Sequence, residues 1–284
     1  MLPKPATGLY ETIVTAALES ELESLADSLA AQRTRLRSSE AGDRLALHIA
    51  GLVQASIEDL PDKERVQRGL ELTRILITTL ARELEAPDLL EDLPALEESM
   101  LEAILGREPD GSLAKIDPPL IPLLDTTLLT NAPGEPTVGS QLRTEIDSAQ
   151  QIDLVMAFVR RSGIRPFLTA FRHHCQAGKT LRVLTTTYTG STELRALEEL
   201  AALGAEVRVS YDTTGTRLHA KAWLFHRAAR MSTAYIGSSN LTHQAQRTGL
   251  EWNVRVSGAR NQSVVEKMNA VFDAYWESGD FEPF

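Results

Sequence analysis

Residues 217–226, Arg-Leu-His-Ala-Lys-Ala-Trp-Leu-Phe-His, decide the fold class of this chain and suggest its chemistry. Small or aliphatic residues alternate with larger ones, which predicts a strand buried on both faces. Side chains repeat every two residues along a strand, so we expect His219 and Lys221 on one face, about 7 Å apart. Together they can touch one phosphate, with Lys221 neutralising its oxygens and His219 free to attack phosphorus.

A glycine turn follows this strand. Residues 232–237 predict a second short buried strand that runs into Gly-Ser-Ser-Asn at positions 237–240. Glycine lets the backbone approach an anion closely, and Ser238 and Asn240 offer hydroxyl and amide donors. If either of the last two residues of the turn caps a helix beginning near Leu241, free backbone N–H groups also point at the phosphate.

A carboxylate belongs to the third predicted strand, residues 250–256. Glu251 could accept a hydrogen bond from the second ring nitrogen of His219, which would fix its tautomer and orientation. Alternation along the strand assigns two sets of side chains to opposite faces. The predicted core face carries Trp252, Val254 and Val256, and the other face carries Glu251, Asn253 and Arg255.

These three segments resemble the phospholipase D superfamily, whose signature is His-x-Lys, four residues, Asp, then Gly-Ser-x-Asn. The matching positions are His219, Lys221, Gly237, Ser238 and Asn240, with Glu251 where nuclease-like members carry a glutamate. The resemblance covers roughly residues 120–284. Residues 185–190 and the pattern around His219 look more narrowly like the nuclease-like module at the N-terminus of certain bacterial superfamily II DNA helicases.

The chain departs from this signature in two ways. His226 stands at the aspartate position, and the gap from there to Gly237 is lengthened by what looks like a hairpin through residues 227–231. The family uses that aspartate more for structure than for chemistry. The departure still favours, as an alternative function, a non-catalytic nucleic-acid or protein-interaction module with a degenerate pocket.

The resemblance implies a metal-independent phosphodiesterase or endonuclease that cleaves DNA through a phosphohistidine, with no cofactor and in a helicase system. A phospholipid-processing enzyme is a third possibility, disfavoured by the single motif. The family mechanism needs two histidines, and this chain has one His-x-Lys. Single-copy members supply the second histidine by dimerising, which implies a homodimer through the catalytic domain. His226 and His243 are the alternative acids within the chain.

Composition sets the broad class. At 284 residues, 43% hydrophobic and 24% charged, the chain should form two globular domains. No apolar run approaches the roughly 18–20 residues of a membrane span, and residues 1–7 lack the pattern of a secretion signal. The single cysteine, Cys175, excludes an internal disulfide and gives no metal cluster. We therefore expect a cytoplasmic protein without membrane association.

The acidity of the chain is confined to its first half. Residues 1–118 contain 12 Lys or Arg and 23 Asp or Glu, while the remainder contains 17 and 16. The first half also carries leucines at helical spacing, which predicts a small all-α bundle in a domain of residues 1–110. Its predicted helices span residues 9–37, 41–59, 61–86 and 94–105.

The second domain, residues 119–284, alternates strands with helices after a linker at 106–119. This order predicts an α/β fold with a mostly parallel sheet flanked by helices. Strands are expected near 123–129, 152–158, 181–187 and 205–211, followed by the three motif strands. Helices are expected at 139–149, 164–176, 191–203 and 261–278.

Overall fold

The computed structural model describes residues 7–107, 109–113, 116–132, 134–188, 190–212, 218–228, 230–242 and 251–284. The chain divides into two compact units, Met1–Ile104 and Leu105–Phe284. The predicted domain limits, 1–110 and 119–284, remain a proposal. No helix in the described ranges is both long and apolar enough to cross a membrane.

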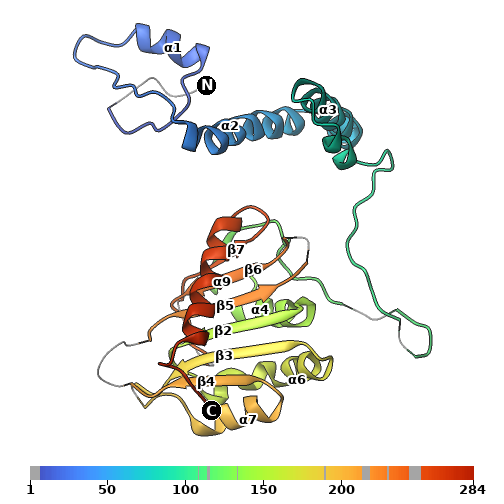
Figure 1. The fold of residues 1–284 in the computed structure, drawn as a ribbon, viewed down its shortest axis with the longest axis vertical. Helices are drawn as coiled ribbons and strands as arrows, with labels where there is room; N and C mark the ends of the chain where they lie inside the picture. The colour runs from blue at the N-terminus through green and yellow to red at the C-terminus, as the bar shows by residue number, and fades with distance from the viewer. Residues whose placement is uncertain are drawn as a thin grey trace. The chain divides into compact units, whose positions relative to one another are not determined.

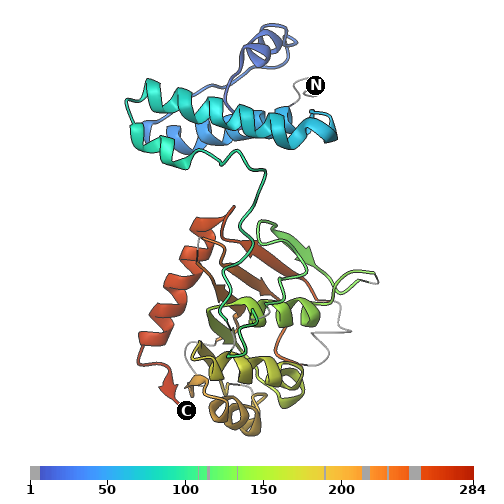
Figure 2. The ribbon, with the colours of Figure 1, turned by 90° about the vertical axis from the view of Figure 1, so that its right-hand side faces the viewer.

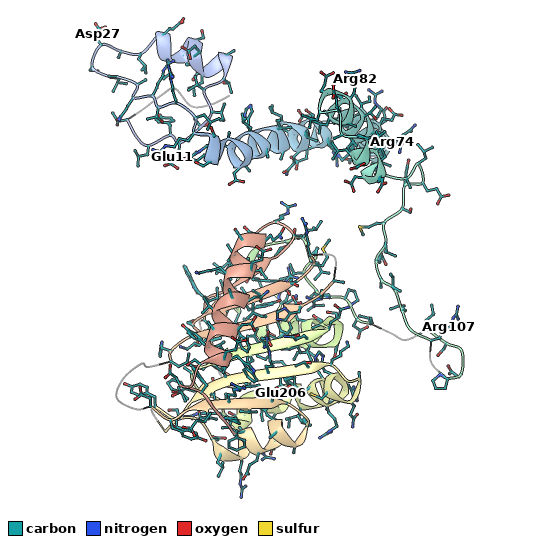
Figure 3. The ribbon with its side chains drawn as sticks, viewed as in Figure 1. Glu11, Asp27, Arg74, Arg82, Arg107 and Glu206 are labelled. Atoms are coloured by element: carbon teal, nitrogen blue, oxygen red, sulfur yellow. The ribbon has the colours of Figure 1, made fainter. Side chains whose placement is uncertain are left out.

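The N-terminal unit is helical. Its elements are α1 (Ala16–Glu23), α2 (Ser38–Glu58), α3 (Asp62–Glu83) and the 3-10 helix η1 (Pro87–Asp92). Thr15 caps α1 by accepting a hydrogen bond from the Leu18 amide at 3.2 Å. Arg74 on α3, labelled in Figure 3, donates a hydrogen bond to the Pro94 carbonyl and so ties the chain after η1 back to α3.

Two helices predicted for this unit differ from the structure. The helix expected over 9–37 is reduced to α1, because the Ser24 hydroxyl donates to the Glu21 carbonyl where the helix ends. Residues 94–104 form no helix. The predicted core face of α2 is exposed at Leu45, Ile49 and Leu52. An apolar stripe specifies a helix face that can be buried, but it does not specify which element buries it.

The C-terminal unit is built on a sheet in the order β1-β7-β6-β5-β2-β3-β4-β8 (Figure 1). The predicted α/β class, a sheet flanked by helices, is confirmed. The strands are β1 (Thr127–Leu129), β2 (Gln151–Met156), β3 (Thr180–Thr186), β4 (Glu206–Ser210), β5 (Lys221–His226), β6 (Thr233–Gly237), β7 (Asn253–Ser257) and β8 (Glu282–Pro283).

The sheet is mixed, so the prediction of a mostly parallel sheet is wrong in that detail. Among the described strands, β2–β3 and β3–β4 pair in parallel, and the other neighbours pair antiparallel. A parallel pair needs a crossover of a dozen or more residues. Helices provide it between β2, β3 and β4, whereas residues 227–232 between β5 and β6 are long enough only for a hairpin.

Helices cover the sheet unequally on its two faces (Figure 2). On one face α9 (Gln262–Glu277) packs over Leu224 and Leu184 through Phe272. The opposite face buries Trp223 and Phe225 in the larger core. That face is covered by α4 (Val138–Ser148), α5 (Arg161–Ile164), the 3-10 helix η2 (Arg165–Phe167), α6 (Leu168–Gln176) and α7 (Leu194–Ala202).

Candidate functional site

The His-x-Lys pair lies at one end of the two central strands, where β2 ends and β5 begins. β5 starts at Lys221, so His219 precedes the strand instead of lying within it. The Ala220 carbonyl accepts a hydrogen bond from the Ala157 amide at 3.1 Å, which fastens this segment to the end of β2. The imidazole is therefore exposed on a backbone that the sheet holds in place.

The Lys221 ammonium lies directly against the His219 ring. Its Nζ is 3.3 Å from Nδ1 and 3.5 Å from Nε2, and it donates to the His219 carbonyl oxygen at 2.8 Å. Lys221 is 7% exposed, while His219 faces solvent with the Phe158 ring edge-on at 6.3 Å. The ammonium and the exposed imidazole are therefore close enough to contact the same phosphate.

Two opposing effects act on Lys221. Burial disfavours the charged ammonium and lowers the pKa of Lys221 below its ordinary 10.5, while the negative charge of Glu251 acts in the opposite direction. The Glu251 carboxylate is thus an electrostatic neighbour of the ammonium. In the described part of the chain its hydrogen-bond donor is Ser238, not His219.

The glycine turn places Ser238 beside this carboxylate. Gly237 pairs with Asn253 at the end of β6, where a side-chain carbon would lie 2.2 Å from the Trp252 carbonyl oxygen, so only glycine fits. Ser238 donates to Glu251 through its hydroxyl and to the Trp252 carbonyl through its amide, the latter at 3.1 Å. Ser238 and Glu251 therefore lie together at the same end of the strands as Lys221.

Asn240 is held within the same turn. Its neighbour Ser239 accepts a hydrogen bond from the Asn253 amide at 2.7 Å, and both of these side chains are buried. The Asn240 Oδ1 atom is buried and takes no donor among the residues that the structure describes. A cavity of ≈ 10 Å³ lined by Asn240 and Trp223 adjoins it, room for about one water molecule.

The face assignment predicted for β7 is wrong. Arg255 is fully buried and Asn253 is 5% exposed, whereas Trp252 and Val254 are 69% and 38% exposed. The reason is Glu145 on α4, whose Oε1 accepts a hydrogen bond from the Arg255 Nε at 2.8 Å. A buried arginine is stable when its charge is paired in this way, so the apolar residues occupy the other face.

Glu145 is the largest feature that the sequence reasoning missed. Besides Arg255, its carboxylate accepts hydrogen bonds from Tyr235 at 2.7 Å, Thr233 at 2.8 Å and Arg227 at 2.6 Å. Burial alone would raise the pKa of Glu145, but the charges of Arg227 and Arg255 outweigh it and lower the pKa below 4.5. The available signal was a charged residue, Arg255, within a cleanly alternating strand.

His226 is not part of this site. It is the last residue of β5, at the opposite end of the strand from Lys221. Five residues of strand separate the two, a distance of about 16 Å. Its Nε2 lies 2.7 Å from the Asp153 carboxylate, which also binds Arg182 through two hydrogen bonds. The interpretation of His226 as an alternative acid is therefore wrong, and His243 lies outside the described residues.

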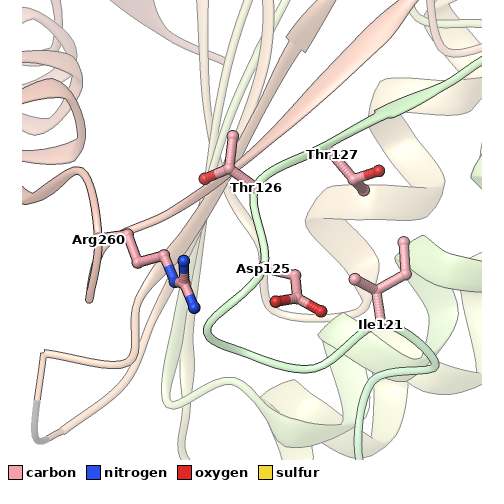
Figure 4. A pocket seen from close by; sticks show the side chains of 5 residues that line it. All are labelled: Ile121, Asp125, Thr126, Thr127 and Arg260. Carbon is pink, nitrogen blue, oxygen red and sulfur yellow. The ribbon is translucent and has the colours of Figure 1, made fainter. Parts of the chain in front are cut away.

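A separate hollow of ≈ 350 Å³ lies where β1 begins and β7 has ended (Figure 4). Among the described residues no histidine, lysine or cysteine lines it, and it lies beside the edge strand β1, three strands away from β5. Its lining residues are Ile121, Asp125, Thr126, Thr127 and Arg260. In the described ranges no three His, Cys, Asp or Glu side chains gather as metal ligands.

Comparison with known proteins finds similarity in both structure and sequence. Among solved structures, similar chains include the phospholipase D family member Nuc from Salmonella typhimurium (18% identity, covering 56% of this chain and 97% of that one, TM-score 0.43). NucT from Helicobacter pylori is 12% identical over 56% of this chain and 99% of that one, with a TM-score of 0.44. Polyphosphate kinase from Porphyromonas gingivalis is 19% identical over 65% of this chain and 31% of that one, with a TM-score of 0.41.

All three TM-scores are below 0.5, so the similarity to a family is taken from the sequence match alone. No curated protein matches the chain. Residues 142–276 match the family described as "Cardiolipin synthase, PLD-like domain", and this segment contains β2 to β7, α9 except its last residue, and every residue of the candidate site. Residues 142–276 of the C-terminal unit are therefore similar to a PLD-like domain.

Proposed function

We propose that this domain is a metal-independent phosphodiesterase that cleaves nucleic acid, DNA in the first instance, by attack of His219 on phosphorus. The observation that carries the proposal is the Lys221 ammonium lying 3.3 Å from an exposed imidazole nitrogen. A cation held that close to a nucleophile binds the phosphate that the nucleophile attacks. Ser238, Asn240 and Glu251 belong to the same proposed site.

The reaction proceeds in two balanced steps. A ring nitrogen of His219 forms a bond to phosphorus while the bond to the leaving oxygen breaks, and that oxygen takes a proton. Water then attacks the phosphohistidine, which releases the phosphate ester and restores the imidazole. Lys221 stabilises the charge on the non-bridging oxygens in both steps, with Ser238 and Asn240 as hydrogen-bond donors.

The proton for the leaving oxygen requires a second acid, which is worth roughly 10²–10⁴ in rate. With one His-x-Lys per chain, we assign this role to His219 of a second copy in a homodimer. The nuclease-like position of Glu251 supports nucleic acid over lipid as the substrate. We further propose that the protein works with a helicase, for which the resemblance of residues 185–190 is the support.

The direct test is cleavage of plasmid and oligonucleotide DNA in EDTA. The wild type should cleave, and His219→Ala should be inactive while remaining folded. His173→Ala, which removes an exposed histidine on α6, serves as the matched control and should keep full activity. Unchanged cleavage by His219→Ala, or activity that requires Mg²⁺, would refute the proposal. Phosphatidyl substrates in parallel test the lipid alternative.

A further inference from the structure

The chain continues beyond β2 as a short extended segment, residues 158–160, beside the candidate site. Its middle residue, Val159, is fully buried and makes a parallel bridge with Leu241, the residue after Asn240. The Val159 carbonyl oxygen accepts a hydrogen bond from the Glu193 amide at 2.9 Å. The segment is therefore held in place through its middle residue.

The residues on either side of Val159 have side chains that reach solvent. Arg160 is exposed and its backbone is extended, with φ −116° and ψ 149°, while Phe158 is half-buried. Side chains alternate between the two sides of an extended chain, so Phe158 and Arg160 both project away from the core that holds Val159, about 7 Å apart. The segment thus presents an aromatic ring and a cation together.

The Phe158 ring lies against the proposed nucleophile. Its centroid is 6.3 Å from that of the His219 ring, and the two planes are inclined at 78°. A phosphate bound between His219 and Lys221 therefore brings the sugar and base of its nucleotide to this ring. Bases stack on aromatic side chains of this kind in proteins that bind single strands, and they do so whatever their sequence.

The Arg160 guanidinium is available to a second phosphate. In the described ranges it has no hydrogen-bond or ion-pair partner, whereas the next arginine, Arg161, is paired with Glu199 on α7. The Arg160 amide donates to the Leu241 carbonyl oxygen at 3.2 Å, which holds this residue beside the turn that carries Asn240. A planar guanidinium suits the oxygens of a phosphate.

We propose that Phe158 and Arg160 form a nucleotide subsite next to the phosphate that is cleaved. The base of the adjoining nucleotide stacks on Phe158, and the next phosphate of the strand binds Arg160. The inference rests on the proposed function and names its substrate more closely. A base within a duplex is paired and stacked on its neighbours, so only an unpaired nucleotide can offer its face to Phe158. The substrate is therefore a single strand at this position.

The first test measures binding without cleavage. A fluorescent single-stranded oligothymidylate is titrated in EDTA with His219→Gln chains, which lack the nucleophile, and the change in anisotropy gives Kd. Adding Phe158→Leu should weaken binding at least about 5-fold, whereas Phe158→Tyr, which keeps the ring, should bind like the parent. Phe284→Leu is the matched control and should have no effect, because Phe284 is 42% exposed and follows the edge strand β8.

An oligonucleotide of the same length without bases separates the two contacts. Phe158→Leu should not weaken its binding, whereas Arg160→Gln should weaken binding of both oligonucleotides. Arg160→Gln should also reduce the slope of log affinity against log salt concentration by about 0.7, the contribution of one phosphate contact on a single strand. The control is Arg172→Gln, which should leave the slope unchanged, since Arg172 is exposed on α6 and also has no partner in the described ranges.

Cleavage by chains that retain His219 supplies the second readout. The kcat/KM for single-stranded DNA should exceed that for duplex DNA, and Phe158→Leu should reduce the ratio at least about 5-fold. An equal loss of binding to the normal and the abasic oligonucleotide in Phe158→Leu, or an unchanged ratio, would overturn the inference. The proposed function fails differently: chains that show this binding pattern but cleave nothing in EDTA refute only the activity, and chains that cleave DNA but bind both oligonucleotides alike refute only the subsite.

Discussion

The His226 ring nitrogen Nε2 lies 2.7 Å from the Oδ2 atom of Asp153, on the neighbouring strand β2. The family signature places an aspartate at position 226, and here the carboxylate comes from β2 while an imidazole comes from β5. Asp153 is 1% exposed, and it also binds Arg182. The His226 and Arg182 hydrogen bonds lower the pKa of Asp153 despite the opposing effect of burial. The departure at position 226 is thus accommodated within the fold, away from the site.

His226→Ala should therefore leave cleavage nearly intact. We expect a rate per folded molecule within about twofold of wild type, since the ring is about 16 Å from Lys221. Loss of a hydrogen bond to a charged group should lower the free energy of unfolding by roughly 1.5–3 kcal/mol. Tryptophan fluorescence reports the unfolding of the C-terminal unit alone, because the three tryptophans, Trp223, Trp252 and Trp276, all lie in that unit. Cleavage that disappears in the folded variant would give His226 a role in the chemistry.

Glu251→Gln should shift the pH dependence of cleavage. Burial lowers the pKa of Lys221, and the Glu251 charge opposes that effect. Removing the charge while keeping an acceptor for Ser238 should lower the pKa of Lys221 further. The alkaline limb of kcat/KM, where the ammonium loses its proton, then moves to lower pH. A limb that stays in place or moves upward would show that Glu251 does not act on Lys221.

Local spacing in the sequence predicted which residues form the proposed site. Strand periodicity and the Gly-Ser-Ser-Asn turn predicted that His219, Lys221 and Ser238 lie together. The structure places them at the same end of neighbouring strands. Strand direction and burial were harder, because they depend on residues distant in the chain. Arg255 is buried by Glu145, 110 residues away. The helix expected over 94–105 has suitable residues but no helical structure.

Gly163→Ala should reduce cleavage by displacing the backbone that carries Asn240. Gly163 on α5 lies against the residue that follows Asn240, and an added side-chain carbon would come within 1.8 Å of the Leu241 carbonyl oxygen. The backbone must move, which should displace Asn240 and reduce cleavage at least about 10-fold. Gly279→Ala is the control, since no atom lies within 4 Å of the added carbon. Equal activity of the two variants would exclude a positioning role for Gly163.

Glu145→Gln should destabilise the C-terminal unit by roughly 3–5 kcal/mol, because Arg255 and Arg227 lose a buried partner. Glu198→Gln, at an exposed site on α7, should have no effect. Because the folded pKa of Glu145 is below 4.5, its stabilisation is present above pH 4.5 and is lost as the pH falls through the lower folded value. The acid-range decline in wild-type stability should therefore be shallower in the variant, and equal slopes would contradict this.

The central claim is the covalent phosphohistidine at His219. The oligonucleotide should carry its label on the fragment that is expected to remain attached to His219. It is mixed with enzyme in EDTA, and the reaction is quenched at alkaline pH within one turnover. The protein is then digested and its peptides are analysed by mass spectrometry. The account predicts a nucleotide adduct on the peptide that contains His219, absent from the His219→Ala variant. Cleavage that proceeds without an adduct at His219, or an adduct on another side chain, would contradict it.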